Sequence, residues 1–166
     1  MSDSTMGTRP RDTRTPGASA PGAVLLASAL LLASVAPATG QSFQAPAEGQ
    51  QVVLVTGSTS GLGREVALRM GELGAHVIVH GRNEARGRAV VEEIDATPGS
   101  ARFLQADFAS FDEVRRLARE ILADYERLDV LVNNAGFGSA PDERLVSEDG
   151  NEFRFQVNYL SPFLLT

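Results

Sequence analysis

Three glycines with the spacing of a phosphate-binding turn point most directly to chemistry. Gly57, Gly61 and Gly63 follow the apolar run Val52–Val55 and open an amphipathic segment. Glycine permits a tight turn and lets backbone N–H groups approach a ligand, while a helix N-terminus behind the turn favours an anion. The pattern predicts a diphosphate site, with an ordinary glycine-rich connection as the alternative. The P-loop of nucleotide triphosphatases is excluded, because no Gly-Lys-Ser/Thr follows.

Two charged residues further along the chain could make such a site specific. Folds that bind a dinucleotide with a free ribose 2′-hydroxyl place an acid at the end of the second strand, where this chain has Gly81 and Arg82. An arginine suits a 2′-phosphate through charge-assisted, fork-like hydrogen bonds, unless it is simply a solvated residue at a strand end. Asp107 ends the third predicted strand. Its carboxylate could accept the adenine amino group, or could belong to a turn near Ser110.

The elements that must position these residues alternate between strands and helices. We expect short strands at residues 52–55, 75–79, 103–107 and 128–132, the first of them a continuous apolar run. Such alternation with short connections predicts an α/β fold with a doubly wound parallel sheet, of the Rossmann type. Right-handed crossovers give the strand order 3-2-1-4, with a ligand crevice between strands 1 and 4 where the winding reverses.

Four helices are expected between and after these strands. Gly74 is placed to end the first, Asn83 to cap the second, and Ser110 with Glu113 to form a capping box for the third. A loop through Pro141 leads to the last, which starts near Asn151. The apolar residues expected to face inward are Val66, Ala67, Met70 and Leu73 in the first helix, Ala89, Val90 and Ile94 in the second, Val114, Leu117, Ala118, Ile121 and Leu122 in the third, and Phe153, Val157, Leu160 and Leu164 in the last.

Taken together, these motifs resemble the short-chain dehydrogenase/reductase family. The resemblance rests on Thr-Gly-x-x-x-Gly-x-Gly from Thr56 and on Asn-Asn-Ala-Gly from Asn133, and it runs from about Val52 to Thr166. The closing stretch from Asn151 to Thr166 is most similar to the retinol-dehydrogenase-like branch. The resemblance implies an oxidoreductase that transfers hydride between a nicotinamide and a small-molecule alcohol or carbonyl substrate.

The resemblance also implies roles for individual residues, with Arg82 favouring NADP over NAD. Asn158 matches the family's catalytic asparagine, which positions a water in a proton relay; without the resemblance, a buried helix amide bonded to nearby backbone would be favoured. The implied cofactor-binding residues are Thr56, Gly57, Ser60, Gly61, Leu62 and Gly63 around the diphosphate, Arg82 and Asn83 at the 2′-phosphate, Asp107 and Phe108 at adenine, and Asn134, Ala135 and Gly136 at the ribose side and central sheet.

The family's remaining catalytic groups, a serine and a Tyr-x-x-x-Lys motif, have no match here. Neither Tyr125 nor Tyr159 is followed by a lysine four residues later, and all 15 basic residues are arginines. In that motif the lysine lowers the pKa of a tyrosine that is otherwise near about 10. We therefore expect the chain to be the cofactor-binding half of the enzyme, marginally stable, prone to self-association and inactive alone. The alternatives are a non-catalytic nucleotide-binding module and a non-functional fragment.

Residues 1–50 differ in composition and are expected to form a leader outside the domain at 51–166. Arg9, Arg11 and Arg14 precede the apolar segment 23–36, which is short for a membrane span of about 20 residues. This pattern resembles a secretory signal or membrane anchor and predicts export or membrane association; a disordered leader on a cytoplasmic protein is the alternative. A homodimer is a further possibility that the resemblance implies.

Charge and composition exclude several other classes of function. The net charge of −6 disfavours nucleic-acid binding, which needs a basic surface. The absence of cysteine excludes disulfides and thiolate metal sites. The two histidines, His76 and His80, lie four residues apart in one predicted strand, where they are poorly placed to share a zinc ion, so no metal site is expected.

Overall fold

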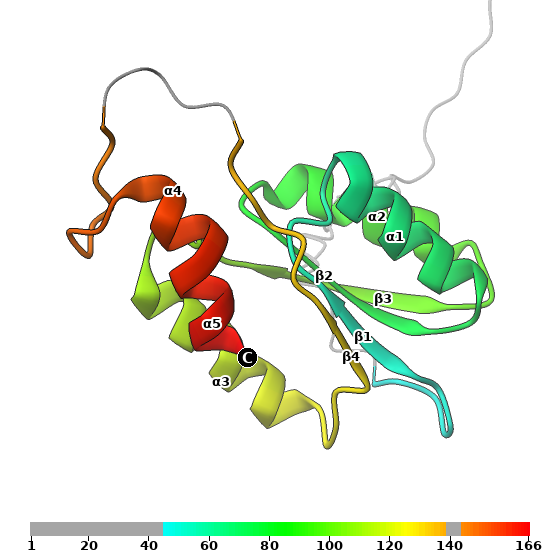
Figure 1. Ribbon diagram of the computed structural model, residues 1–166. Helices are drawn as coiled ribbons and strands as arrows, with labels where there is room; N and C mark the ends of the chain where they lie inside the picture. Colours follow the sequence, from blue (N-terminus) through cyan, green and yellow to red (C-terminus); the bar gives the residue numbers. More distant parts are fainter. Residues whose placement is uncertain (1–44, 139–143) are drawn as a thin grey trace, which may run out of the picture. The chain divides into compact units, whose positions relative to one another are not determined.

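The described part of the chain, residues 45–138 and 144–166 of a computed structural model, is built around a parallel sheet of four strands (Figure 1). The strands are β1 (Val52–Val55), β2 (His76–Gly81), β3 (Ser100–Gln105) and β4 (Val130–Val132), in the order β3-β2-β1-β4. Both the predicted α/β class and the predicted strand order are confirmed. β2 and β3 are longer than expected and β4 is shorter, pairing with β1 over three residues.

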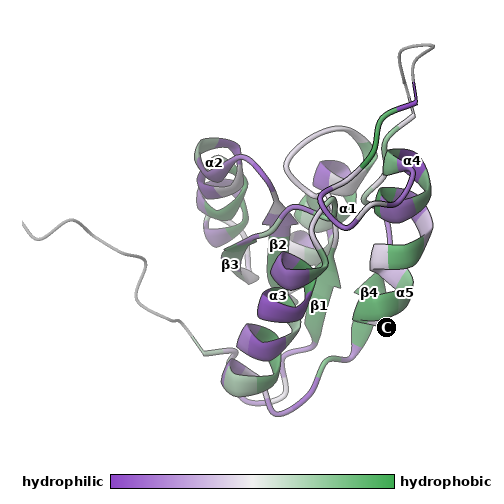
Figure 2. Ribbon diagram, turned by 90° about the vertical axis from the view of Figure 1, so that its left-hand side faces the viewer, coloured by the Kyte–Doolittle hydropathy of each residue, from purple (hydrophilic) through white to green (hydrophobic). Residues whose placement is uncertain are grey.

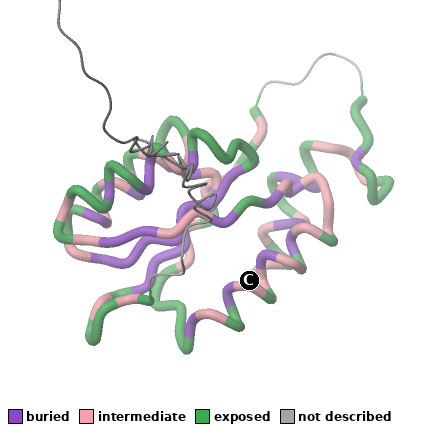
Figure 3. The backbone as a smooth tube through the Cα atoms, turned by 180° about the vertical axis from the view of Figure 1, so that it is seen from behind, coloured by how far each residue is buried: buried purple, intermediate pink, exposed green. Residues whose placement is uncertain are grey.

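Helices cover both faces of the sheet, and the two central strands β1 and β2 are buried at every position. Helices α1 (Gly61–Glu72) and α2 (Glu84–Asp95) pack on one face, against Val53, Val55, Val77 and Val79. On the other face, α3 (Phe111–Asp124) packs against a core that contains Val52, Leu54, Ile78 and Leu104. The hydrophilic outer side of α3 contrasts with the hydrophobic strands behind it in Figure 2, and the buried strands are visible in Figure 3.

Two of the predicted helix ends are confirmed. At the end of α1, Gly74 has a φ of +85°, and the Ala75 N–H donates to the Met70 carbonyl at 3.0 Å in a Schellman motif. At the start of α2, the Asn83 side chain accepts from the Arg86 N–H at 2.9 Å. Both ends depend on contacts within a few residues of sequence, which explains why sequence alone located them.

The predicted capping box of α3 is wrong. Ser110 occupies the N-cap position, but among the described residues its side chain caps no amide. Glu113 instead reaches past Ser110 and accepts from the Asp107 N–H at 2.7 Å. The carboxylate therefore fixes the segment after β3 rather than the first turn of α3.

Two leucines predicted to face inward are exposed. Leu73 is 66 % exposed, because the buried stripe of α1 is formed by Gly63, Ala67 and Gly71, which allow close approach of neighbouring elements. Leu122 is 78 % exposed, since the buried face of α3 passes through Ile121, one residue earlier. In the second helix, Val90 and Ile94 are buried as expected, whereas Ala89 is exposed.

The C-terminal helix is interrupted by a π-helical turn. It comprises α4 (Phe153–Phe155), the π turn η1 (Gln156–Leu160) and α5 (Ser161–Leu165). A π turn inserts one residue into the helical repeat, so Ser161 becomes buried after Val157 and the expected inward residue Leu164 is exposed. The Ser161 hydroxyl donates to the Phe108 carbonyl at 2.6 Å, which holds this helix over the segment after β3.

The amino end of the sheet contains a buried polar network around His76. Its Nδ1 lies 2.8 Å from the Ser100 hydroxyl and its Nε2 lies 3.0 Å from the Tyr125 hydroxyl. Ser100 also donates to the Gln50 side chain, whose amide in turn donates to the Gly74 carbonyl at 2.9 Å. Burial lowers the pKa of His76 and raises the pKa of Tyr125. The network ties residue 50, within the predicted leader, to the sheet.

The apolar segment 23–36 lies outside the described residues, so the leader expected at residues 1–50 stays a prediction for its first 44 positions. Within residues 45–138 and 144–166, none of the helices has the length and apolar character needed to cross a membrane. Part of the predicted loop through Pro141 also lies outside these ranges.

Candidate cofactor-binding site

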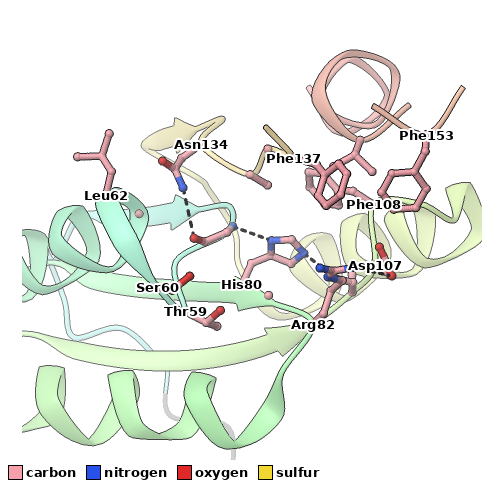
Figure 4. A pocket seen from close by; sticks show the side chains of 17 residues that line it. Thr59, Ser60, Leu62, His80, Arg82, Asp107, Phe108, Asn134, Phe137 and Phe153 are labelled. Carbon is pink, nitrogen blue, oxygen red and sulfur yellow. Dashed lines mark hydrogen bonds and ion pairs between the residues drawn. The ribbon is translucent and has the colours of Figure 1, made fainter. Parts of the chain in front are cut away.

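A cavity of about 270 Å³ lies where the carboxyl ends of β1, β2 and β3 meet the segment after β4 (Figure 4). This is the edge at which a doubly wound sheet binds its ligands. Of the residues proposed from sequence, the cavity brings together Gly57, Ser60, Leu62, Gly63, Arg82, Asp107, Phe108, Asn134, Ala135 and Gly136. Thr56, Gly61, Asn83 and Asn158 lie outside its lining.

Two glycines of the turn are required by close contacts with the segment after β4. A Cβ on Gly57 would lie 2.8 Å from Cα of Ala135, and the φ of Gly57 is +67°. A Cβ on Gly63 would lie 2.3 Å from Nδ2 of Asn134. That amide nitrogen donates to the carbonyl of Thr56 at 2.9 Å, so it cannot move away freely. The two distant motifs therefore interlock in the folded chain.

Thr56 lies beneath the cavity and joins β1 to the chain after β4. Its hydroxyl donates to the Val132 carbonyl at 3.2 Å and accepts from the Asn134 and Ala135 N–H groups, each at 3.0 Å. The residue is fully buried. Its position indicates that it supports the turn from below, without facing the cavity.

The N-terminus of α1 is open towards the cavity. Ser60 is the N-cap residue with extended backbone, yet within the described chain its hydroxyl caps no amide, and the first turn of α1 contains no acid. By contrast, α2 is capped by Asn83 and begins with Glu84. The first amides of any helix lack partners inside the helix and carry partial positive charge. Ser60, Leu62 and Gly63 line the cavity, so this end of α1 is suited to an anion.

Arg82 and Asp107 face each other across the far side of the cavity. The Arg82 guanidinium lies 3.6 Å from the Asp107 carboxylate, and the Arg82 side chain is 63 % exposed. Asp107 also accepts from the Ala109 N–H at 2.9 Å, so it shapes the turn after β3 as well as lining the cavity. The Asn83 side chain is used to cap α2. Arg82 therefore supplies the cationic side chain in the lining of the cavity.

His80 also lines this cavity, although nothing in its sequence context singled it out. It is 2 % exposed, at the penultimate position of β2. Its Nδ1 accepts from the Gly57 N–H at 3.1 Å, and its Nε2 lies 3.2 Å from the Ala106 carbonyl. Burial lowers the pKa of His80 to about 4, so the ring is neutral at physiological pH.

Comparison with known proteins decides the family. The sequence profile described as short chain dehydrogenase matches residues 51–166. The chain belongs to the short-chain dehydrogenase family. The 3beta-hydroxysteroid dehydrogenase of Mediterraneibacter gnavus is 44 % identical over 108 residues, which make up 65 % of this chain and 38 % of the relative. Retinol dehydrogenase 14 of Mus musculus is 39 % identical over 128 residues, or 70 % of this chain and 38 % of the relative.

A solved structure supports the same assignment. A metagenomic short-chain oxidoreductase in complex with NADP superposes with a TM-score of 0.61 at 37 % identity, covering 69 % of this chain and 52 % of that one. The family and the retinol-dehydrogenase-like resemblance predicted from the motifs are thereby confirmed. The chain spans about two-fifths of the length of the two curated relatives.

Asn158, predicted from the family resemblance to be the catalytic asparagine, lies in the π turn. The Asn158 side chain accepts from the Phe137 N–H at 2.7 Å and donates to the Phe137 carbonyl at 3.1 Å. It is exposed, unlike the buried helix amide considered as the alternative, but it does bond to nearby backbone. The π turn thus joins the C-terminal helix to the segment after β4.

Several lining residues were not identified from sequence. Phe137 and Phe153 meet edge to face, with ring centroids 5.3 Å apart, and add an apolar wall. Apolar residues give no signal that separates such a wall from the core. The missed lining residues are Thr59, His80, Gly81, Ala106, Phe137, Phe153 and Val157.

Proposed function

We propose that this chain forms the NADP(H)-binding part of an oxidoreductase that transfers hydride between the nicotinamide and an alcohol or carbonyl substrate. The observation that carries the proposal is the uncapped N-terminus of α1 opening into the same cavity as the Arg82 guanidinium. A dinucleotide with an extra phosphate presents two anionic groups, and these two features supply one positive partner for each.

The details of the cavity fit the parts of NADP(H). The first turn of α1 would hold the pyrophosphate through backbone N–H groups. Arg82 would leave its long ion pair with Asp107 to bind the 2′-phosphate, and Asp107 with Phe108 would meet the adenine. The relative solved in complex with NADP supports this cofactor choice. Once bound, the nicotinamide supplies or accepts the hydride.

The experiment compares NADP(H) with NAD(H) by calorimetry on the folded 166-residue chain. We expect Arg82→Leu to weaken NADP(H) binding by about tenfold, because charge-assisted hydrogen bonds are lost, and to leave NAD(H) binding nearly unchanged. Arg69→Leu, at a similarly exposed arginine outside the cavity, is the matched control. A folded chain that binds neither nucleotide would contradict the proposal.

Turnover is expected to require groups that these residues do not provide. The 166 residues contain no lysine, so the chain cannot by itself supply the Tyr-x-x-x-Lys motif of the family. We expect no oxidation of alcohols or reduction of carbonyls by this chain with NADP(H), although Asn158 is placed beside the site. A nucleotide-binding module without catalysis is the second candidate function; tight NADP(H) binding is expected in both cases.

The partners of the protein are also part of this proposal. Three exposed aromatic residues, Phe155, Tyr159 and Phe163, recur every four residues along the C-terminal helix and offer a surface for a homodimer. Membrane association through residues 23–36, export and the cytoplasmic alternative stay predictions. Size-exclusion chromatography with light scattering tests the dimer, and fractionation of cells that express residues 1–166 or 45–166 tests the segment.

A further inference from the structure

The side chain of His80 connects two segments that form opposite sides of the cavity. Its ring lies between the glycine turn after β1 and the segment after β3, which are 23 and 26 residues away in sequence. One ring nitrogen contacts the Gly57 N–H and the other contacts the Ala106 carbonyl (Figure 4). The ring also stacks on Phe108, with centroids 4.7 Å apart.

We propose that His80 is a positioning residue for the cofactor: by accepting from the Gly57 N–H while anchored to Ala106, it fixes the glycine turn in the shape that receives a pyrophosphate. This inference rests on the proposed function and assigns a residue to it that does not itself need to touch the phosphates.

The two contacts require one particular form of the imidazole. Nδ1 must be an unprotonated acceptor for the Gly57 N–H, so the proton must lie on Nε2, from which it is donated to the Ala106 carbonyl. A doubly protonated ring would turn an N–H towards the Gly57 N–H. Burial, which lowers the pKa of His80 to about 4, keeps the ring in the neutral form that the geometry needs.

The backbone of His80 holds the next residue of the turn. Its carbonyl accepts from the Ser58 N–H at 2.8 Å, and its N–H donates to the Ser58 hydroxyl at 2.9 Å. One residue of β2 thus binds two consecutive residues of the turn, the first through its side chain and the second through its backbone.

This arrangement decides which amides remain for a ligand. The N–H groups of Gly57 and Ser58 are both used within the protein, so a pyrophosphate is directed to the amides at the start of α1. Without the ring acceptor, the part-buried Gly57 N–H would lose its partner within the protein, and the turn would no longer be held in one conformation. We therefore expect a loss of binding affinity only for ligands that carry a pyrophosphate.

Two substitutions separate positioning from general packing. His80→Asn keeps an acceptor, because the amide oxygen of asparagine takes the place of Nδ1. His80→Phe keeps the stacking ring on Phe108 but removes both nitrogens. Each full-length variant is titrated with NADPH by calorimetry and with adenosine 2′-monophosphate, which lacks the pyrophosphate, by NMR; circular dichroism verifies folding.

We expect His80→Phe to weaken NADPH binding by about tenfold, His80→Asn to stay within about threefold of the unaltered chain, and adenosine 2′-monophosphate to bind all three alike. Unchanged NADPH affinity in folded His80→Phe would overturn the inference, as would equal losses in both variants or equal losses for both ligands. If His80→Phe does not fold, His80→Gln replaces it, since its longer amide reaches towards Ala106 and not Gly57. Failure of the unaltered folded chain to bind NADPH would instead refute the proposed function.

Discussion

Acidification from pH 7 to pH 5 should destabilise this protein through the buried His80, which contacts the glycine turn. Burial lowers the pKa of His80 from its ordinary 6.5 to about 4 in the folded chain. The unfolded chain therefore takes up a proton near pH 6.5 that the folded chain resists until about pH 4. The contribution of His80 to the free energy of unfolding is therefore fully present above pH 6.5 and is lost as the pH falls from 6.5 to about 4.

The magnitude follows from the difference between these two pKa values. The difference of about 2.5 corresponds to about 3 kcal/mol at 1.36 kcal/mol per pKa unit, reached in full below pH 4. Applying the same linkage to the two end points, about 2 kcal/mol of this is lost between pH 7 and pH 5. His76 acts in the same direction, because burial also lowers its pKa.

The assay is urea unfolding followed by circular dichroism at pH 7, 6 and 5. The free energy of unfolding should fall by about 2 kcal/mol or more over this range in the unaltered chain. The His80→Asn variant has no titratable group at this position. Its free energy of unfolding should fall by about 2 kcal/mol less than that of the unaltered chain, and the remaining fall should come mainly from His76. Equal stability of the unaltered chain at pH 7 and pH 5, or an identical fall in the variant, would refute the reasoning.

Three substitutions test other contacts of the site and the fold. Gly63→Ala would place a Cβ 2.3 Å from Nδ2 of Asn134; we expect a loss of about 2 kcal/mol in unfolding free energy and of NADPH binding by calorimetry, with Gly138→Ala, in open space, as the neutral control. Thr56→Val removes a hydroxyl that accepts from two amides and should cost about 2 kcal/mol in urea unfolding; an effect below a quarter of that would argue against its supporting role. Tyr125→Phe removes a hydroxyl from the buried network at the other end of the sheet. It should cost about 1 kcal/mol while NADPH affinity stays unchanged, and a changed affinity would show that the two ends of the sheet are coupled.

The parts of the fold that sequence predicts are those determined by local or strictly periodic chemistry. The run Val52–Val55 is apolar at every position, as a strand covered on both faces must be. Gly74 and Asn83 act on residues within four positions of themselves. The strand order needs one additional rule, the right-handed crossover, which depends on the twist common to all sheets.

Errors arose where close packing overrides hydrophobicity. Leu73 is more hydrophobic than Gly71, but Gly71 is the buried residue, because Ile94 packs so closely on it that a Cβ there would lie 2.7 Å from the Ile94 side chain. The same competition at the C-terminal helix favours Ser161 over Leu164, since a π turn shifts the repeat and the Phe108 carbonyl offers a partner. The hydrophobic pattern of a helix contains no information about how closely the neighbouring elements approach it.

The functional roles within the glycine turn depend on tertiary register rather than on spacing. Val79 pairs with Val55, so His80 follows on the face of β2 that reaches Gly57 and Ala106. A slip of one residue in the pairing of β1 with β2 would move the imidazole to the opposite face of the sheet. The sequence shows three glycines whose amides could each face a ligand, yet the Gly57 N–H is bonded to the His80 ring. The pairing of β1 with β2 therefore determines which amides are free to face a ligand. Those amides cannot be identified from sequence until the pairing is known.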